Sequence, residues 1–302
     1  MARGGVRRGA RRAVAAALSL VLLTGCTLID EEPSQSGAKV RAVEQVRVGD
    51  ETTVRAGGRR FATRCAGEPE APAVLLVAAE GTPMARAWAP VQGRIGAFAR
   101  VCAYDRLGVG RSGRPPAAQT FDDLAADLLR VLDRLKMTEP VVLVGQSLGG
   151  TVAVAAAAQA PDRVGGVLLL AAAGPGYPGA VLDRLPVTGR RGAAERRVWS
   201  DLRSPADNPE HLDGGRAFAA AESFDLRDDV ALVALTHSIA QHPRSTSPRQ
   251  QADLESAWEA GQNRWLRLSS AGRLERVDLA GHDIAAARPE LVVRRVRGLL
   301  PR

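Results

Sequence analysis

The sequence of 302 residues lacks the features of a multi-span membrane protein, a nucleic-acid-binding protein or a disordered chain. No apolar run reaches the about 18 residues that a membrane-spanning helix needs. Aromatic residues make up only 4% of the chain, and no basic patch has aromatic residues interleaved with it. Hydrophobic residues are not depleted. At 45% they exclude disorder throughout the chain and suffice for one sizeable α/β domain.

Acidic residues are missing from the start of the chain, and this accounts for most of its positive charge. The formal net charge is +8, but the first 25 residues hold five arginines and no acid, so residues 26–302 carry 8 − 5 = +3. This small surplus is scattered among acidic residues. No nucleic-acid partner is therefore predicted.

The N-terminus has the pattern of an export signal. Five arginines precede an apolar stretch of 11 residues at 13–23, which is too short for a stable transmembrane helix. Leu23-Thr24-Gly25-Cys26 follows and resembles the lipobox of bacterial lipoproteins, which implies cleavage before Cys26 and a diacylglyceryl group on its sulfur. The alternatives are an ordinary signal peptide with an accidental cysteine and a weakly matching twin-arginine signal. We expect a signal peptide over residues 1–25 and a lipid anchor on the extracytoplasmic face of the cell membrane.

Residues 26–45 are mostly polar and include proline, serine and glycine, which predicts a tether before a domain at residues 46–302. Apart from Cys26, the chain has two cysteines, Cys65 and Cys102. An oxidising location permits a disulfide between them, and two unrelated buried thiols are the alternative.

Short apolar runs alternate with helical patterns over most of the domain. This alternation predicts βαβ units and a mostly parallel sheet, and hence an α/β fold. Strands are predicted at residues 46–54, 60–64, 74–78, 100–104, 141–144, 167–170, 231–235 and 273–279. Helices are predicted at residues 88–98, 121–135, 149–160, 250–268 and 289–300. Residues 174–229, rich in Pro, Gly, Arg and Asp, interrupt the alternation and predict a cap inserted over the sheet.

The most informative motif is Gly145-Gln146-Ser147-Leu148-Gly149, which lies between a predicted strand and a predicted helix. In that context G-x-S-x-G predicts a nucleophilic serine on a strained turn. The N-terminus of the following helix would direct backbone N–H groups toward a developing oxyanion. The alternative is a Ser-Gly turn without chemistry.

These residues resemble the α/β-hydrolase family over roughly residues 50–300. Residues 104–112 are similar to the family's loop after its fourth strand, and Gly281-His282-Asp283-Ile284 is similar to its histidine loop. The resemblance implies an α/β-hydrolase fold with helices on both faces of a mostly parallel sheet. It also places the strands of Cys65 and Cys102 side by side, which favours the disulfide. Residues 108–113 also match G-x-G-x-x-G, but prolines follow where a dinucleotide-binding helix should begin.

A serine nucleophile needs a base, and His282 is the candidate because it lies between a strand and the last helix. His211 lies in the cap, and His237 and His242 are interpreted as surface or loop histidines. No pair of histidines or carboxylates has zinc-like spacing, so neither a metal nor another cofactor is predicted.

The third member of the expected triad is missing from both positions that the family uses. The residues after 231–235 contain no acid, and Ala171-Ala172-Ala173 follows the strand at 167–170. Asp201, Glu210 and Asp253 are the remaining candidates. A Ser–His dyad or an impaired enzyme is the alternative.

The oxyanion loop also departs from the family, because Ala78-Ala79-Glu80-Gly81 stands where many relatives have His-Gly. Backbone N–H groups of Leu148 and Glu80 can still form the hole, since no particular side chain is required. A carboxylate at Glu80 would oppose an oxyanion unless it turns away or pairs, for example with Arg106.

The sequence thus predicts a lipid-anchored serine hydrolase that cleaves an ester or related acyl bond of a small molecule, with Ser147 as nucleophile and His282 as base. A peptidase or amidase of the same fold, and a binding lipoprotein with a degenerate site, are the alternatives.

Overall fold

The computed structural model describes residues 44–185, 189–238 and 242–301. The predicted signal peptide, Cys26 and nearly all of the predicted tether lie outside these residues. No helix in the described ranges combines the length and apolarity needed to cross a bilayer.

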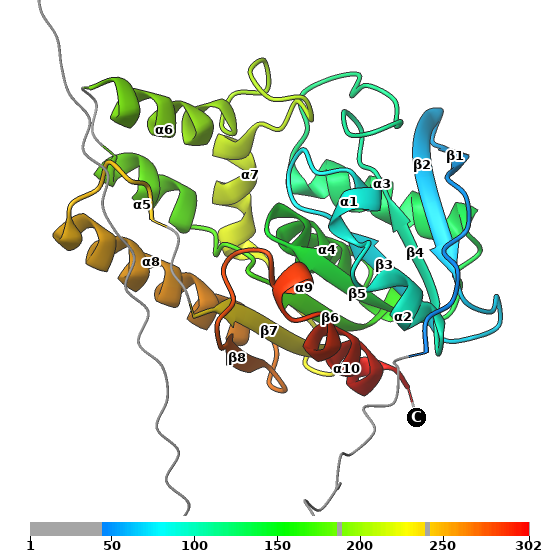
Figure 1. Cartoon of the computed structure of the whole chain (residues 1–302). Helices are drawn as coiled ribbons and strands as arrows, with labels where there is room; N and C mark the ends of the chain where they lie inside the picture. Colours follow the sequence, from blue (N-terminus) through cyan, green and yellow to red (C-terminus); the bar gives the residue numbers. More distant parts are fainter. Residues whose placement is uncertain (1–43, 186–188, 239–241, 302) are drawn as a thin grey trace, which may run out of the picture. The chain divides into compact units, whose positions relative to one another are not determined.

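Eight strands form one sheet in the order β1-β2-β4-β3-β5-β6-β7-β8 (Figure 1). The first three strands of that order pair antiparallel, and all later pairs are parallel. The sheet is therefore mostly parallel, as the sequence predicted. The strands are β1 Thr52–Ala56, β2 Arg59–Ala66, β3 Ala73–Val77, β4 Arg100–Tyr104, β5 Val141–Gln146, β6 Val164–Leu170, β7 Ala231–His237 and β8 Arg273–Val277.

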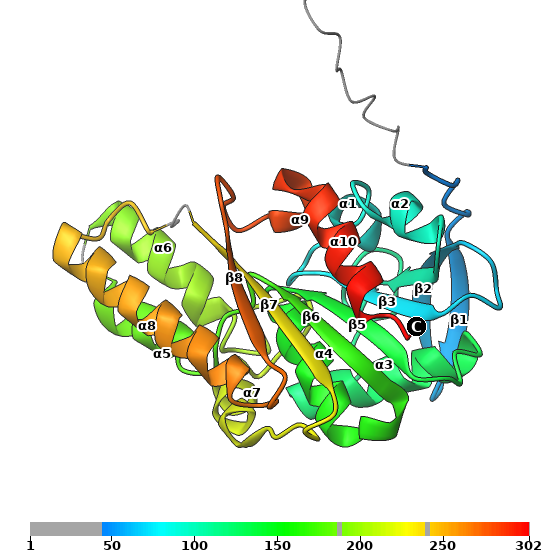
Figure 2. The ribbon, with the colours of Figure 1, turned by 90° about the horizontal axis from the view of Figure 1, so that it is seen from below.

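Helices cover both faces of the sheet (Figure 2). One face packs against α3 Phe121–Arg134 and α4 Leu148–Gln159. The other packs against α1 Met84–Ala87, α2 Gln92–Gly96, α9 Ile284–Ala287 and α10 Pro289–Leu299. Helix α8, Pro248–Leu266, lies beside β7. This layering makes the architecture α/β, and it leaves the carboxyl ends of the parallel strands free for a site.

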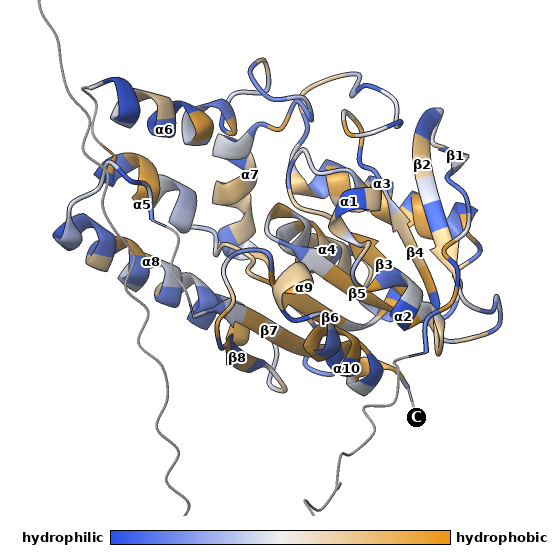
Figure 3. Cartoon of the chain, viewed as in Figure 1, coloured by the Kyte–Doolittle hydropathy of each residue, from blue (hydrophilic) through white to orange (hydrophobic). Residues whose placement is uncertain are grey.

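The central strands are apolar throughout because both of their faces are buried. Leu75 and Leu143 point into the core under α3 and α4, whereas their neighbours Val74 and Val142 point into the opposite core. Figure 3 shows these strands in the hydrophobic colour. Continuous apolar runs are therefore a stronger predictor of these strands than polar–apolar alternation would be.

Two predicted elements are wrong. Residues 88–98 form no single helix, since Pro90 cannot donate a helical hydrogen bond, and the chain makes α1 and α2 instead. The strand predicted from residue 46 begins only at Thr52. The Val46 N–H donates to the Gly93 carbonyl of α2 at 3.0 Å, and the Gly49 N–H donates to the Cys65 carbonyl of β2 at 2.9 Å, so this segment lies against α2 and the edge of β2 without forming a strand.

Cys65 and Cys102 form a disulfide between β2 and β4, where they face each other in the antiparallel register. The pairing that the family resemblance implied is thus present. The bond joins residues 37 positions apart in the chain. A loop of that length corresponds to about 3–4 kcal/mol of stabilisation in the chain-entropy treatment of the unfolded state.

The segment predicted as a cap holds α5 Tyr177–Arg184, α6 Arg190–Asp201, α7 Gly214–Ala220 and a short 3-10 helix at Ala221–Ser223. It leaves the sheet after β6 and returns at β7. Gly174 lies against Gly261 of α8 so closely that a Cβ on Gly174 would be 2.2 Å from the Gly261 Cα. This close approach seats the start of the cap on α8, above the carboxyl ends of the strands.

Candidate active site

Ser147 lies on a sharp turn between β5 and α4. Its φ is 52° and its ψ is −122°, a backbone conformation that costs a non-glycine residue free energy. A Cβ on Gly145 would lie 2.4 Å from the Gly149 carbonyl oxygen, and one on Gly149 would lie 2.2 Å from the Val77 carbonyl oxygen. Only glycine fits at these two positions, and the tight turn exposes the serine hydroxyl. The G-x-S-x-G motif thus forms the strained turn that the sequence predicted.

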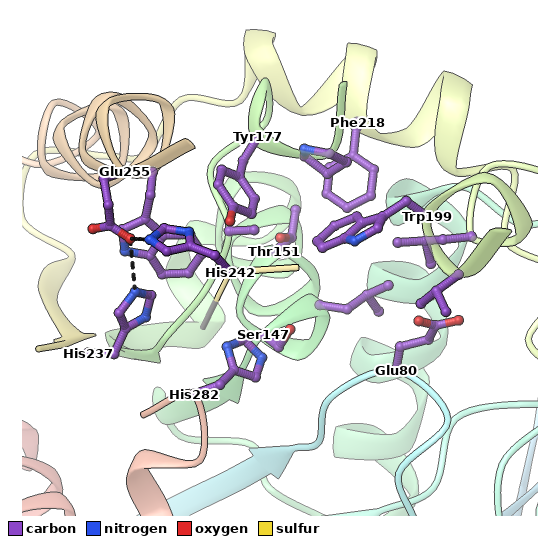
Figure 4. Close-up of a pocket in the computed structure, with 16 residues that line it drawn as sticks. Glu80, Ser147, Thr151, Tyr177, Trp199, Phe218, His237, His242, Glu255 and His282 are labelled. Carbon is purple, nitrogen blue, oxygen red and sulfur yellow. Dashed lines mark ion pairs between the residues drawn. The ribbon is translucent and has the colours of Figure 1, made fainter. Parts of the chain in front are cut away.

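Ser147 and His282 open into the same cavity of about 300 Å³ (Figure 4). The cavity lies between the sheet and the cap. It is lined by Glu80, Ser147, Leu148, Thr151, Ala173, Tyr177, Pro178, Val198, Trp199, Leu202, Phe218, His237, His242, Glu255, Trp258 and His282. The structure therefore brings the predicted nucleophile, base and oxyanion residues together.

The loop that carries His282 is fastened to its surroundings on two sides. The Asp283 side chain caps α9 by accepting from the Ala286 N–H at 3.1 Å. The side-chain amide of Gln146, next to Ser147, approaches the same carboxylate at 3.4 Å. The Ser238 N–H donates to the Ala280 carbonyl at 3.1 Å. His282 is thereby held beside Ser147 (Figure 4).

Burial lowers the pKa of His282, and the neighbouring Asp283 carboxylate opposes this shift only in part. Desolvation penalises the charged imidazolium, so the ring is neutral at pH 7. A neutral imidazole is the form that can accept the proton of a serine hydroxyl.

Two backbone N–H groups, from Leu148 and Glu80, are predicted to hold an oxyanion. Leu148 is the first residue of α4, and Glu80 follows β3 in the loop against which Gly149 packs. The next N–H of that loop, from Gly81, is already used, since it donates to Glu210 Oε1 at 2.8 Å. The N–H groups of Leu148 and Glu80 thus remain as the candidates that the sequence suggested.

Arg106 does not pair with Glu80, contrary to one expectation from the sequence. It binds Glu210 instead, through Nε to Oε2 at 2.7 Å and Nη2 to Oε1 at 2.8 Å. Its Nη1 and Nη2 also donate to the carbonyls of Ala78 and Ala79, at 2.6 and 3.1 Å. Through these contacts the buried Arg106–Glu210 pair joins the loop after β3 to the cap.

Glu80 is left beside a second carboxylate without a hydrogen bond from Arg106. Burial raises the pKa of Glu80 from 4.5 to about 7, and the Glu210 carboxylate adds to this increase while Arg106 opposes it. The neutral form of the Glu80 carboxyl is thus populated near neutral pH.

Within the described residues, none of the three suggested acids lines the cavity. Glu210 is engaged with Arg106. Asp201 lies 3.5 Å from Arg197, and Asp253 lies 4.0 Å from Arg184. These three carboxylates have other partners, and the acid candidates taken from the sequence are wrong in position.

Sequence reasoning missed Glu255, which projects from α8 into the cavity (Figure 4). Its Oε1 lies 3.3 Å from His242 Nε2 and 4.0 Å from His237 Nε2. Helical spacing was the available signal, because Glu255 stands one turn before Trp258 on the buried side of α8. An acidic residue beside the buried face of this predicted helix could therefore have been predicted as a site residue.

His237 and His242 both line the cavity. The prediction of a surface or loop histidine is wrong for the buried His237, whereas His242 lies in the loop after β7 as predicted. His237 ends β7, and its ring packs on Trp258 with centroids 4.6 Å apart. Burial lowers the pKa of His237 to about 4, and the nearby rings of His282 and His242 and the Arg276 guanidinium add to this decrease. His237 is therefore neutral at pH 7, although Glu255 is near.

Aromatic side chains form the wall of the cavity on the cap side. Tyr177 packs edge-to-face on Trp199 and on Trp258, at 5.9 and 5.0 Å between ring centroids. Phe218 and Val198 complete this apolar wall. It favours an apolar or aromatic group over a charged one in the part of the cavity remote from Ser147.

Metal binding and dinucleotide binding have no site in the described ranges. No group of three or more His, Cys, Asp or Glu side chains there could hold a metal ion. The glycine-rich loop at residues 108–113 is not followed by a helix until Phe121, and Gly108 packs against the Pro209 carbonyl of the cap. The loop thus packs against the cap and does not open a helix as a dinucleotide fingerprint would.

Comparisons with known proteins agree with this geometry. Residues 94–208 match the family model described as alpha/beta hydrolase fold. Among solved structures, 2-hydroxy-6-oxo-6-phenylhexa-2,4-dienoate hydrolase from Rhodococcus sp. strain RHA1 is similar with a TM-score of 0.60 and 16% identity, covering 84% of this chain and 99% of that one. The chain has the α/β-hydrolase fold. Carboxylesterase CesB from Bacillus subtilis is also similar, with a TM-score of 0.57 and 19% identity over 85% of this chain and 93% of that one.

Closer sequence similarity covers a shorter segment. The chain is 40% identical over 92 residues to 2-hydroxymuconate semialdehyde hydrolase from Pseudomonas sp. strain CF600, which is 30% of this chain and 32% of that protein. The chain spans about a third of the length of the curated relatives that it matches.

Proposed function

We propose that this α/β-hydrolase-fold protein is a serine hydrolase that cleaves an ester or related acyl bond. The observation that carries the proposal is the strained Ser147, which opens into a cavity that also holds the neutral imidazole of His282. Strain at a turn is retained where function requires an exposed side chain. The similar hydrolases and the carboxylesterase support the same class of reaction.

The reaction runs in two halves. Ser147 Oγ attacks the acyl carbon while His282 takes the hydroxyl proton, and the N–H groups of Leu148 and Glu80 bind the oxyanion. As the intermediate collapses, His282 gives the proton to the leaving oxygen, and the alcohol departs from an acyl-Ser147 ester. Water then attacks this ester with the same proton transfers, which releases the acid and restores the serine.

The charge that balances an imidazolium at His282 comes, in this proposal, from Glu255. His237 occupies the end of β7, next to the position where the family resemblance expected an acid. A neutral His237 can orient the His282 ring. The Glu255 carboxylate, whose Oε1 lies 4.0 Å from His237 Nε2, supplies the negative charge. Glu255 is thus a positioning residue, which acts through the histidines.

The substrate class follows from the cavity wall. Four aromatic side chains and a volume of about 300 Å³ favour an aromatic or short aliphatic acyl group. We therefore expect hydrolysis of p-nitrophenyl phenylacetate and butyrate, and at least about tenfold lower kcat/KM for the palmitate, whose chain exceeds the cavity.

The test compares these esters with the p-nitroanilide of phenylacetic acid under identical conditions. Turnover of the esters with little anilide cleavage supports the proposal, whereas faster anilide cleavage would make the protein an amidase. Binding of phenylacetate without turnover of any ester would indicate a non-catalytic binding protein and would refute the proposal.

We further propose that the mature protein is held to the extracytoplasmic face of the membrane by lipid on Cys26. The support is the sequence Leu-Thr-Gly-Cys after the apolar core, since two or more acyl chains give stable anchoring. In the native host, Cys26→Ser is expected to move the protein from the membrane fraction to a soluble or uncleaved form. Cys65→Ser with Cys102→Ser is the control that should stay in the membrane fraction. Wild-type protein that incorporates no radiolabelled palmitate would contradict the assignment.

A further inference from the structure

The Glu80 side chain occupies the oxyanion side of the cavity. Figure 4 shows Glu80 and His282 on opposite sides of Ser147, with both side chains lining the same space. The N–H of Glu80 is one of the two oxyanion donors in the proposed mechanism, and its side chain lines the cavity into which Ser147 opens. A group in that position influences the transition state directly.

We propose that the Glu80 carboxyl works in its neutral form as a hydrogen-bond donor to the bound substrate, and that its ionisation turns the enzyme off. The proposal rests on the proposed function. No proton is transferred from Glu80 in this role, since the carboxyl donates a hydrogen bond and keeps its proton through the cycle. It would therefore be a catalytic residue with a side-chain role as well as a backbone role.

The charges around Glu80 favour its neutral form. Arg106 is the nearest cation, but its Nε, Nη1 and Nη2 atoms donate to Glu210 and to two backbone carbonyls. Glu210 brings a second carboxylate from the cap, and this carboxylate also accepts the Gly81 N–H. The other titratable side chains that line the cavity come from the remaining elements around it, and they are His282, His237, His242, Glu255 and Tyr177.

Ionisation of Glu80 would place two negative charges around the same reacting group. A carboxylate beside an oxyanion in a poorly solvated cavity raises the energy of the transition state, whereas a neutral carboxyl can donate to it. Burial and the Glu210 carboxylate raise the pKa of Glu80 to about 7, so the change of charge falls near neutral pH. His282, whose pKa is lowered by burial, is already neutral on the acid side of this change.

The consequence is a loss of activity at alkaline pH, which a plain Ser–His site does not show. In the full-length protein, kcat for p-nitrophenyl phenylacetate should fall at least about tenfold between pH 6.5 and pH 9 while KM changes little. In Glu80→Gln the amide cannot ionise and still offers a donor, so the ratio of kcat at pH 9 to kcat at pH 6.5 should rise at least about tenfold above the wild-type ratio.

Glu80→Ala removes the donor as well as the charge. Its kcat should show no alkaline decrease and should lie below that of Glu80→Gln at every pH. Glu139→Gln is the matched control, since Glu139 is exposed in the loop before β5, outside the cavity, and its pH profile should match that of the wild type.

Unfolding measurements follow the Glu80 proton independently of turnover. Because the pKa of Glu80 is raised on folding, its contribution to stability is complete below about pH 4.5 and is lost as the pH rises to about 7. The free energy of unfolding of Glu80→Gln minus that of the wild type should therefore increase between pH 5 and pH 8. Urea titrations at several pH values measure this difference.

The two measurements separate the possible failures. An alkaline decrease that persists in Glu80→Gln, or a wild-type profile that stays flat to pH 9, overturns the proposal while leaving the hydrolase assignment intact. A stability difference that is constant from pH 5 to pH 8 overturns it too. A wild type without esterase activity at any pH contradicts the proposed function and this role with it.

Discussion

Ser147→Ala is expected to lower kcat for p-nitrophenyl phenylacetate by about 10⁴- to 10⁶-fold, because it removes the only atom proposed to attack the acyl carbon. The change deletes one oxygen from a buried turn and leaves Gly145 and Gly149 in place. The oxyanion donors of Leu148 and Glu80 remain, so a small residual rate above that in water is expected. Initial rates under substrate saturation measure the effect.

Ser147→Gly at the same position separates the effect on activity from the effect on stability. Glycine adopts a φ of 52° without the penalty that serine bears there, so this variant should be equally inactive and about 1 kcal/mol more stable than the wild type. A protein that is more stable yet inactive cannot owe its inactivity to misfolding. Undiminished turnover in either variant would show that Ser147 is not the nucleophile.

His282→Ala is expected to lower kcat about as much as loss of the serine, because members of such a unit fail together. The pH profile supplies a second check. In the wild type, activity should rise as His282 loses its proton, at a pH below the ordinary histidine pKa of about 6.5, since burial lowers the pKa of this ring. That acid limb should be absent from the residual activity of the variant.

Glu255→Gln should lower kcat at least about tenfold with little change in KM, because the carboxylate is proposed to act through the histidines on the transition state. Asp253→Asn is the matched control on the same helix, where the carboxylate faces Arg184 outside the cavity, and it should be close to wild type. Equal rates in Glu255→Gln and the wild type would leave a Ser–His dyad. Wild-type activity in His282→Ala would refute the assignment of the base.

The fold was predictable wherever local patterns and burial agree. Strand β4 lies at residues 100–104 as predicted, and α3 begins at Phe121 where Thr120 and Asp123 form a capping box. The prediction of secondary structure failed where tertiary contacts or a proline determine the local conformation. Pro90 divides a predicted helix, and the Val46 N–H donates to the Gly93 carbonyl of α2, so the predicted strand begins only at Thr52.

The candidate site was predictable where one short motif contains the geometry. Ser147 with its flanking glycines is such a case, because the turn needs small residues at fixed spacing. Glu255, His237 and the Arg106–Glu210 pair were missed or misassigned because they meet only through the packing of α8 and the cap. No sequence spacing relates Arg106 to Glu210, which lies 104 positions away.

Ser147, activated by His282, is proposed to form an acyl-enzyme bond. Labelling of the purified protein with a fluorophosphonate probe, followed by mass spectrometry of the peptides, tests it most directly. We expect one adduct on Ser147 in the wild type, none in Ser147→Ala and strongly slowed labelling in His282→Ala. Absence of any adduct on the folded wild-type protein, or an adduct on another serine that survives in Ser147→Ala, would contradict it.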